Sequence, residues 1–203
     1  MSANIETPQF FGKKGYTTGE KSLTFEQVSS LLRIMEDLTD LALFEVAVTG
    51  GLRRGDIVKL NWSNLDFSTG KLSFHEQKKK RVHTVFLPQK TLQTLKMLRN
   101  ANPDDFWIFT GFSEKRHGRG HMSERTAYDR FQEYLVKAGI QTEADRRPFH
   151  ALRSTCIKLC QKKGWTIEQT AKHVGDTVRV IQEHYNTPSE EEMKAATESK
   201  PLI

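Results

Sequence analysis

Hydrophobic residues recur three and four positions apart over most of the chain, which is the period of an amphipathic helix. The first such stretch begins after Thr24, a suitable N-cap residue, and the run from Leu41 to Val48 is apolar enough for a buried helix. Gly139 is a natural stop after a later helix. The pattern predicts helices over about residues 25–35, 41–48, 53–60, 91–101, 124–137, 152–160, 167–174, 178–185 and 190–196.

Three short segments between these helices have the β-branched and aromatic content of strands. They cover residues 62–67, 71–74 and 81–87, and a turn at 68–70 joins the first two as a hairpin. Residues 111–125 carry no core pattern and a dense mix of Arg, His and Gly, so we expect a basic loop there. The whole pattern predicts an α+β fold that is mostly helical, with one small antiparallel sheet.

Composition adds a charge bias and argues against a membrane protein. Lysine and arginine number 31 against 25 aspartates and glutamates, which gives a net charge of +6. That excess favours a polyanionic partner without deciding for one. No apolar stretch approaches the ~18 to 20 residues of a membrane helix, and residues 1–20 lack the apolar core of a signal peptide. We therefore expect a soluble, cytoplasmic protein with no membrane partner.

The chain has two cysteines, Cys156 and Cys160, four residues apart. That spacing suits one face of a helix and not a disulfide framework, which favours a reducing compartment. A zinc site made of these two cysteines and His150 is not expected, because it has too few ligands and they are not spaced as in known zinc sites. We therefore expect no bound metal and no cofactor.

Four places hold polar residues that a core does not require. The first is Arg53, which follows a Gly-Gly turn, with Asp56 one helical turn further on to hold its guanidinium. From spacing alone, a surface Arg–Asp pair is favoured by about two to one. The second is the hairpin at 76–88, whose four consecutive cations are either a solvated turn or a means of delivering an ammonium group to a phosphate.

The third place pairs His150 with Arg153, three residues apart on one helical face. Alone, this pair is more simply a partly buried histidine beside an arginine whose head reaches water. The fourth place is Tyr185, near the end of a short helix and shortly before Pro188. Alone, a tyrosine there is more simply a core residue.

The order of these four places resembles the tyrosine recombinase, or phage integrase, family over about residues 23–185. The segment TGGLRRGDIVKLNW is similar to the family's first box, which has an arginine after a Thr-Gly turn, then an acid three residues later and a leucine seven later. Arg53, Asp56 and Leu60 fit. The resemblance implies an integrase-like catalytic domain with a small three-stranded antiparallel sheet.

The expected domain boundaries follow from this resemblance together with composition. Residues 1–22 are polar and interrupted by glycine, so we expect a linker or tether. The catalytic domain is expected over residues 23–187. The tail at 188–203 has a weak apolar face and resembles the family's C-terminal segment. It either packs on a neighbouring protomer or is a frayed end.

The hairpin is similar to the family's catalytic lysine turn. Counting back from Leu87 places that lysine at Lys78, with Lys79 and Lys80 as register neighbours. A lysine on a mobile hairpin is suited to protonating the 5′ oxygen that leaves during DNA cleavage. We therefore assign that role to Lys78.

His150-Ala-Leu-Arg153 matches the family's second box without change, and Tyr185 stands where the nucleophile should be. The resemblance implies that Arg53 and Arg153 clamp a DNA phosphate, because guanidiniums offer paired planar donors and stay charged. Tyr185 then attacks the phosphate, and His150 acts as base or positions it. The expected activity is metal-independent, site-specific DNA recombination through a 3′-phosphotyrosyl intermediate.

One position departs from the family pattern. The family usually has a glycine followed by His or Trp nine residues before the nucleophile, and here Gly175 is followed by Asp176. A carboxylate cannot donate a hydrogen bond to phosphate unless it is protonated. Either His173 or His184 substitutes from a shifted position, or Asp176 is structural and the site works with one donor fewer.

Binding of double-stranded DNA beyond the active site is expected to be electrostatic and to weaken steeply with salt. The resemblance also implies a homo-oligomer of two to four protomers on DNA, in the nucleoid-associated cytoplasm of a prokaryote. For each basic segment, a solvated surface is the alternative. The candidate contacts are Lys79, Lys80, Arg81, Arg116, Arg119, Arg125, Lys158, Lys162 and Lys163.

Two other functions fit part of the pattern. A type IB topoisomerase shares the Arg, Lys, Arg, His and Tyr set but relaxes DNA, and the integrase-like spacing of the first box argues mildly against it. A non-catalytic DNA-binding relative is made plausible by Asp176.

Overall fold

The computed structural model describes residues 21–113, 118–185, 194 and 197–199, and helix α2 (Leu38–Gly50) lies at the centre of that part. Apolar residues lie on all sides of α2, which is why most of the helix is buried, including its acids Asp40 and Glu45. It contacts α1, α3, α4 and α6. The described helices of the main core and of the C-terminal region are α1 (Phe25–Arg33), α2, α3 (Arg54–Ile57), α4 (Gln89–Ala101), α5 (Glu124–Lys137), α6 (Ala151–Lys162), α7 (Ile167–Val174) and α8 (Val178–Tyr185).

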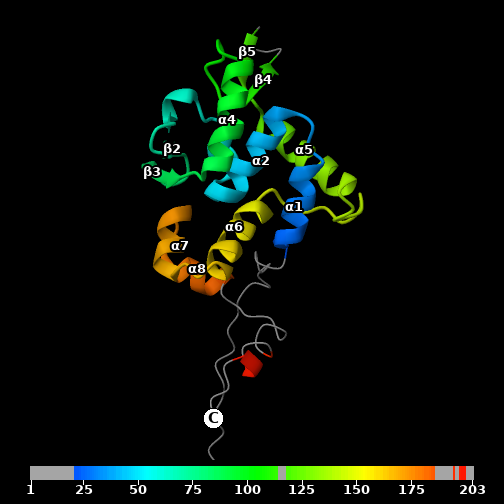
Figure 1. Cartoon of the computed structure of the whole chain (residues 1–203), viewed down its shortest axis with the longest axis vertical. Coiled ribbons are helices and arrows are strands. Elements are labelled where there is room, and N and C mark those ends of the chain that lie inside the picture. The colour runs from blue at the N-terminus through cyan, green and yellow to red at the C-terminus, as the bar shows by residue number, and fades with distance from the viewer. Residues whose placement is uncertain (1–20, 114–117, 186–193, 195–196, 200–203) are drawn as a thin grey trace, which may run out of the picture.

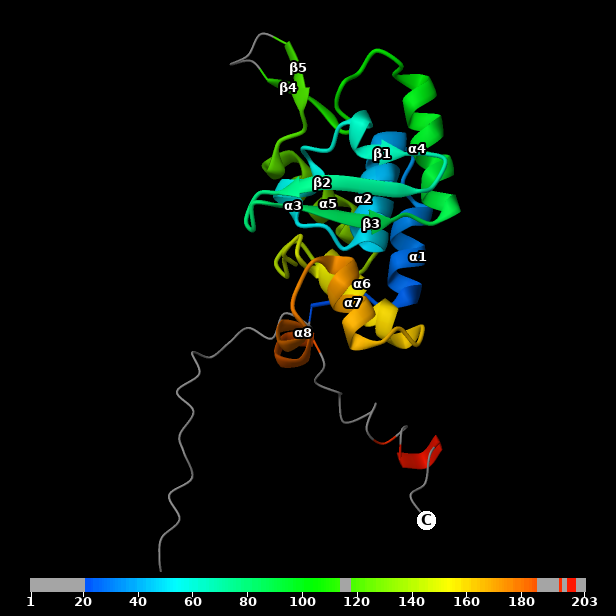
Figure 2. The same cartoon turned by 90° about the vertical axis from the view of Figure 1, so that its left-hand side faces the viewer.

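A three-stranded antiparallel sheet lies across α2 (Figure 2). Its strands, in spatial order, are β1 (Leu65–Asp66), β2 (Lys71–Glu76) and β3 (Arg81–Phe86). Leu72, Phe74 and Val85 are buried in the core, whereas alternate positions on β2 face solvent. The register pairs Glu76 with Arg81, so residues 77–80 form a tight β2–β3 turn. The predicted fold class, mostly helical with this small sheet, is confirmed.

The first predicted strand is much shorter than expected. Residues 62–64 form a 3-10 helix, and only Leu65 and Asp66 pair with β2. The reason is local, because Asn61 and Asn64 cap each other's backbone N–H groups and hold the chain in a turn. The aromatic content of this segment therefore packs without forming a ladder.

The basic loop expected at 111–125 was wrong in part, since much of that segment is a hairpin. β4 (Thr110–Ser113) pairs with β5 (Gly118–His121), and the ribbon projects from the body of the molecule (Figure 1). Met122, directly after it, is fully buried and donates its backbone N–H to the Phe109 carbonyl at 2.7 Å. The residues of these two strands show no alternation of apolar and polar positions, so the sequence carries no strand signal there.

Helices α6, α7 and α8 enclose a second, smaller apolar cluster. Cys156, Ile157, Ile181 and Tyr185 are among its buried members. The predictions for 167–174 and 178–185 are confirmed to the residue, whereas the predicted helix at 190–196 lies almost wholly outside the described residues. No helix in the described ranges is long and apolar enough to cross a membrane.

Candidate active site

Four segments that are far apart in the sequence meet at the carboxylate of Asp176, just after α7. Arg153 donates from Nη2 to Oδ2 over 2.7 Å, and Lys79 donates from Nζ to Oδ1 over 2.9 Å. Arg53 approaches the same Oδ1 with its Nη2 at 3.6 Å. We call Arg53, Lys79 and Arg153 the cation cluster. It gathers positive charge from the start of α3, the β2–β3 turn and α6 around one anion.

The Gly50-Gly51 turn at the end of α2 helps to position two members of this cluster, Arg53 and Arg153. Gly51 has a left-handed backbone (φ +61°), and a side chain there would come within 2.8 Å of Val174 and 3.1 Å of the Cys156 sulfur. The Gly51 carbonyl accepts a hydrogen bond from Arg153 Nη1 at 2.7 Å. The turn thus sets the backbone that leads into Arg53 and also orients the guanidinium of Arg153.

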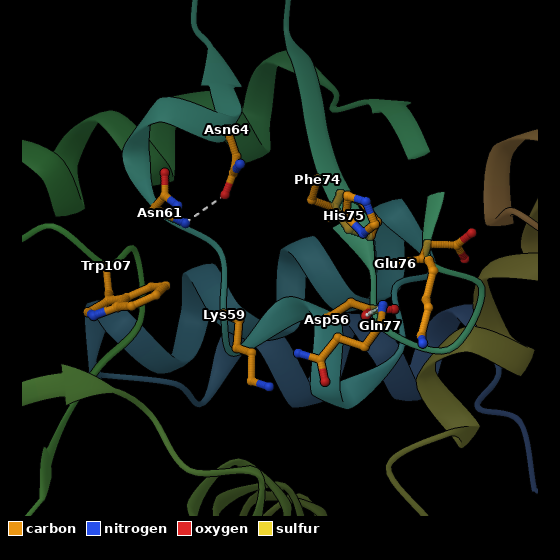
Figure 3. Close-up of a pocket in the computed structure, with 10 residues that line it drawn as sticks. Asp56, Lys59, Asn61, Asn64, Phe74, His75, Glu76, Gln77 and Trp107 are labelled. Atoms are coloured by element: carbon orange, nitrogen blue, oxygen red, sulfur yellow. Dashed lines mark hydrogen bonds between the residues drawn. The ribbon is translucent and has the colours of Figure 1, made fainter. Parts of the chain in front are cut away.

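Arg53 is held by Glu76 and not by Asp56, which corrects the pairing expected from the sequence. Asp56 lies beside Gln77 (Figure 3) and accepts its backbone N–H at 2.9 Å, because α3 is a single turn packed on β2. Glu76 accepts instead from Arg53 Nη1 at 2.5 Å, and only 1% of its side chain is exposed. Sequence reasoning missed Glu76, although it follows Leu72 and Phe74 at an inward position of β2.

Both carboxylates in the site are ionised. Burial raises the pKa of Glu76, but hydrogen bonds from Arg81 and Arg53 outweigh it and bring the pKa below its ordinary value. Burial also raises the pKa of Asp176, and donation from Lys79 and Arg153 again brings the net pKa below the ordinary value. Asp176 is therefore a hydrogen-bond acceptor that cannot donate to a phosphate.

The histidine expected as a substitute for Asp176 is engaged elsewhere. His173 Nε2 lies 2.7 Å from the carbonyl oxygen of Thr49, and its ring packs edge-on against Trp165. The side chain of His184 lies outside the described residues. The geometry favours the other interpretation, in which Asp176 is a structural ligand of the cation cluster.

His150 and Tyr185 form a hydrogen-bonded pair beside the cluster. His150 Nε2 lies 2.8 Å from Tyr185 Oη, and only 6% of Tyr185 is exposed. Burial, followed by the positive charges of Arg153 and Arg53, lowers the pKa of His150 to about 4. The imidazole is therefore neutral at neutral pH, and a neutral imidazole can accept the phenolic proton at one ring nitrogen.

The three lysines of the β2–β3 turn differ in their surroundings. Lys78 is exposed and has no hydrogen bond or ion pair within the described part of the chain, although its charge helps to lower the pKa of His150. Lys79 belongs to the cation cluster and also donates to the Gly175 carbonyl at 2.6 Å. Lys80 is exposed, with a left-handed backbone (φ 48°). The predicted catalytic lysine thus lies outside the cluster, and its register neighbour Lys79 lies inside it.

Comparison with known proteins shows which family this chain belongs to. The model of the phage integrase family matches residues 21–192. The chain belongs to the phage integrase family. A curated relative, the tyrosine recombinase XerA of Pyrococcus furiosus, is 24% identical over 203 residues, which cover 98% of this chain and 68% of that protein.

Solved structures show the same integrase fold. The XerA recombinase superposes with a TM-score of 0.75 at 18% identity, over 90% of this chain and 66% of that one. The XerH site-specific recombinase bound to its difH substrate, in a pre-cleavage complex, gives 0.66 at 15% identity, over 87% and 53%. A lambda integrase dimer bound to a COC′ core site gives 0.64 at 20% identity, over 82% and 47%. The chain therefore spans about half to two thirds of the length of those recombinases.

The basic residues expected to contact DNA differ in their exposure and in their partners. Arg81 donates from Nε to Glu76 and from Nη2 to the Gly175 carbonyl at 3.1 Å, although about half of its side chain is exposed. Arg125 is exposed on α5 and paired with Asp129. Arg116 and the side chain of Arg119 lie outside the described residues. Of the three candidate lysines on α6 and just after it, Lys162 and Lys163 are exposed and Lys158 is half-buried.

Three half-buried histidines, His83, His150 and His173, predict that the stability of the fold decreases in mild acid. The unfolded chain binds a proton at His150 below its ordinary pKa of 6.5, whereas the folded form does so only near 4. The free energy of unfolding should therefore fall by about 2 kcal/mol between pH 7 and pH 5 from this residue alone. Burial lowers the pKa of His83 and His173 as well, which acts in the same direction.

Urea unfolding at pH 7, 6 and 5 measures this loss, above the range in which the site carboxylates titrate. A His150→Asn variant should show a shallower pH dependence than the parent chain, because it lacks the largest of these shifts. An equal slope in the two proteins would contradict the low pKa of His150.

Proposed function

We propose that this chain is a site-specific DNA recombinase that cleaves and rejoins DNA through a 3′-phosphotyrosyl intermediate on Tyr185. The observation that carries the proposal is the 2.8 Å contact between His150 Nε2 and Tyr185 Oη beside the cation cluster. This contact supports the proposal, because it would pair the nucleophile with a neutral base beside the donors that a phosphate needs. The relatives described as bound to DNA, one of them as a dimer, support double-stranded DNA as the substrate and a homo-oligomer on it.

The proposed chemistry balances without an added energy source or metal ion. Tyr185 Oη attacks the phosphorus as its proton passes to His150, and the bond to the 5′ oxygen breaks. Arg53 and Arg153 stabilise the charge that develops on the non-bridging oxygens. Lys78 donates a proton to the leaving 5′ oxygen and completes the step, and a 5′ hydroxyl from another strand can reverse it. Because the phosphotyrosine retains the energy of the broken bond, strands are exchanged without ATP.

The scissile phosphate has to take the place of the Asp176 carboxylate as ligand of the cation cluster. A groove of about 590 Å³ beside the cluster offers a route for the DNA strand. Its walls include Arg53, His150 and two further arginines, Arg54 and Arg146. The phosphate and Asp176 compete for the same donors, and their like charges repel each other. We therefore expect slower cleavage than with a neutral hydrogen-bond donor at position 176.

The test is covalent capture on DNA. A pool of nicked duplexes with randomised sequence is incubated with the protein, and the denatured mixture is resolved on a gel. The expected result is a protein–DNA adduct whose linked peptide contains Tyr185 and whose yield is unchanged by EDTA. Absence of any adduct under conditions where the protein binds DNA would overturn the proposal.

A non-catalytic DNA-binding role is the second candidate, and the paired state of Asp176 favours it. Asp176 already takes hydrogen bonds from Lys79 and Arg153, so the donors that a phosphate needs are occupied. This function predicts retention of DNA on a native gel with no adduct on the denaturing one. A topoisomerase-like activity would instead relax supercoiled plasmid without a preferred sequence.

The general acid can be assigned with a modified substrate. We expect Lys78→Ala to slow cleavage of ordinary DNA by about 10²-fold or more, which is typical of losing a positioned acid. A substrate with sulfur in place of the bridging 5′ oxygen should restore the rate, because a thiolate leaves without a proton. Lys79→Ala should not be rescued in this way. Rescue of Lys79→Ala alone would move the role to Lys79.

A further inference from the structure

Glu76 lies at the junction between the β2–β3 turn and the cation cluster. It is the last residue of β2, two positions before Lys78. Glu76 lines the edge of a pocket, and Figure 3 shows its carboxylate pointing away from Lys59 and Trp107. Glu76 is therefore part of the cluster side of the turn, although it is not a candidate to bind DNA itself.

Both carboxylate oxygens of Glu76 have a guanidinium partner. Oε1 accepts from Arg53 Nη1 at 2.5 Å, and Oε2 accepts from Arg81 Nε at 2.8 Å. Charge-assisted bonds of this kind are stronger than neutral ones. The Glu76 side chain is almost fully buried, but half of Arg81 is exposed, so the bond to Arg53 is the better shielded of the two from water and salt. The two arginines come from the start of α3 and from β3, so one anion sets the positions of both.

The second arginine extends this connection to the corner after α7. Arg81 Nη2 donates to the Gly175 carbonyl at 3.1 Å. Gly175 has a left-handed backbone (φ +71°), and a side chain there would lie 3.1 Å from Glu76 Oε1 and 3.0 Å from the His83 ring. The corner that carries Asp176 thus packs directly on Glu76.

Arg53 depends on Glu76 for its orientation. Its other anionic neighbour within the described residues is Asp176, which lies farther away, at 3.6 Å. In the proposed reaction the phosphate displaces Asp176, so Glu76 becomes the anion that keeps Arg53 in place at the moment of cleavage. A guanidinium displaced by about 1 Å loses much of its effect on a transition state.

We propose that Glu76 is a positioning residue for DNA cleavage, which holds Arg53 in the phosphate clamp and fastens the lysine turn to the Gly175 corner through Arg81. The inference rests on the proposed recombinase function. It does not make Glu76 a catalytic residue, because a buried carboxylate with both oxygens occupied contacts neither the phosphate nor the leaving group.

The test compares Glu76→Gln with the parent chain in single-turnover cleavage over a range of DNA concentrations. Glutamine keeps the shape but offers one acceptor in place of two. The maximal cleavage rate should fall about 10- to 100-fold, while the half-saturating DNA concentration changes less than about 3-fold, because many phosphate contacts set affinity. Asp40→Asn is the matched control, because Asp40 is also a buried acid paired with an arginine, Arg130, but lies on α2, away from the cation cluster. It should lower stability without lowering the cleavage rate.

A double-mutant cycle separates positioning from a general loss of structure. In an Arg53→Ala background, adding Glu76→Gln should slow cleavage clearly less than it does in the parent chain, because Arg53 is gone and only the connection to the lysine turn through Arg81 is left to lose. An equal loss in both backgrounds would overturn the proposal, and so would parent-like cleavage by Glu76→Gln. If Glu76→Gln does not fold, Glu76→Asp, which keeps the charge, takes its place in the cycle. Failure of the parent chain to form an adduct would count against the recombinase function itself.

Discussion

A Tyr185→Phe variant is expected to form no covalent adduct with DNA while it keeps the native fold. The change removes Oη, the nucleophile of the proposed reaction, and the phenyl ring keeps its place in the cluster with Ile157 and Ile181. Loss of the hydrogen bond to His150 should cost only about 1 kcal/mol of stability. The measurement is the denaturing gel used for covalent capture, with circular dichroism to verify the fold.

Tyr134→Phe is the matched control for this change. Tyr134 also donates its hydroxyl to a buried partner, Asp40, at 3.1 Å, and it lies on α5 outside the cation cluster. The control variant should lose a similar amount of stability and form adduct at the parent rate. An adduct that persists in Tyr185→Phe would show that another residue is the nucleophile.

The second large effect is expected for Arg153→Lys. Only 2% of the Arg153 side chain is exposed, and its two terminal nitrogens bond to Gly51 and Asp176. Lysine keeps the charge but lacks the planar fork, so it cannot satisfy both partners and also meet a phosphate oxygen. We expect the single-turnover cleavage rate to fall by about 10²- to 10³-fold, the usual loss for a preorganised donor.

Arg130→Lys tests whether this loss is specific to the site. Arg130 pairs with the buried Asp40 at 2.5 Å, so the same substitution disturbs an ion pair of similar geometry away from the cation cluster. The control should cleave at nearly the parent rate. Parent-like cleavage by Arg153→Lys would mean that Arg153 serves the fold and not the reaction.

The elements that were predicted correctly depend on local patterns. For α7, the Thr166 cap, the apolar period and the terminal Gly175 all lie within ten residues, and both ends were predicted to the residue. The β4–β5 ribbon was missed because its signal is not local to either strand. β4 pairs with β5, and the residues of the two strands show no alternation of apolar and polar positions, so neither period nor composition marks them.

The contacts that define the candidate site could not be predicted in the same way. Lys79 and Asp176 are 97 positions apart, and Arg153 and Gly51 are 102 apart. The one pairing inferred from spacing, Arg53 with Asp56, was wrong, because Glu76 reaches the guanidinium from a neighbouring strand. Spacing along one helix cannot show that a strand from another part of the chain brings a better acceptor.

The sequence by itself determined the helical order, the family resemblance and the set of residue types available for phosphate chemistry. These depend on local periodicity and on short motifs in a given order. Only the tertiary structure decided that Asp176 is an ionised ligand of the cation cluster, that His150 is neutral and paired with Tyr185, and that Glu76 orients Arg53. Ionisation and orientation depend on burial and on charges brought together by folding, and neither is a property of a residue's place in the chain.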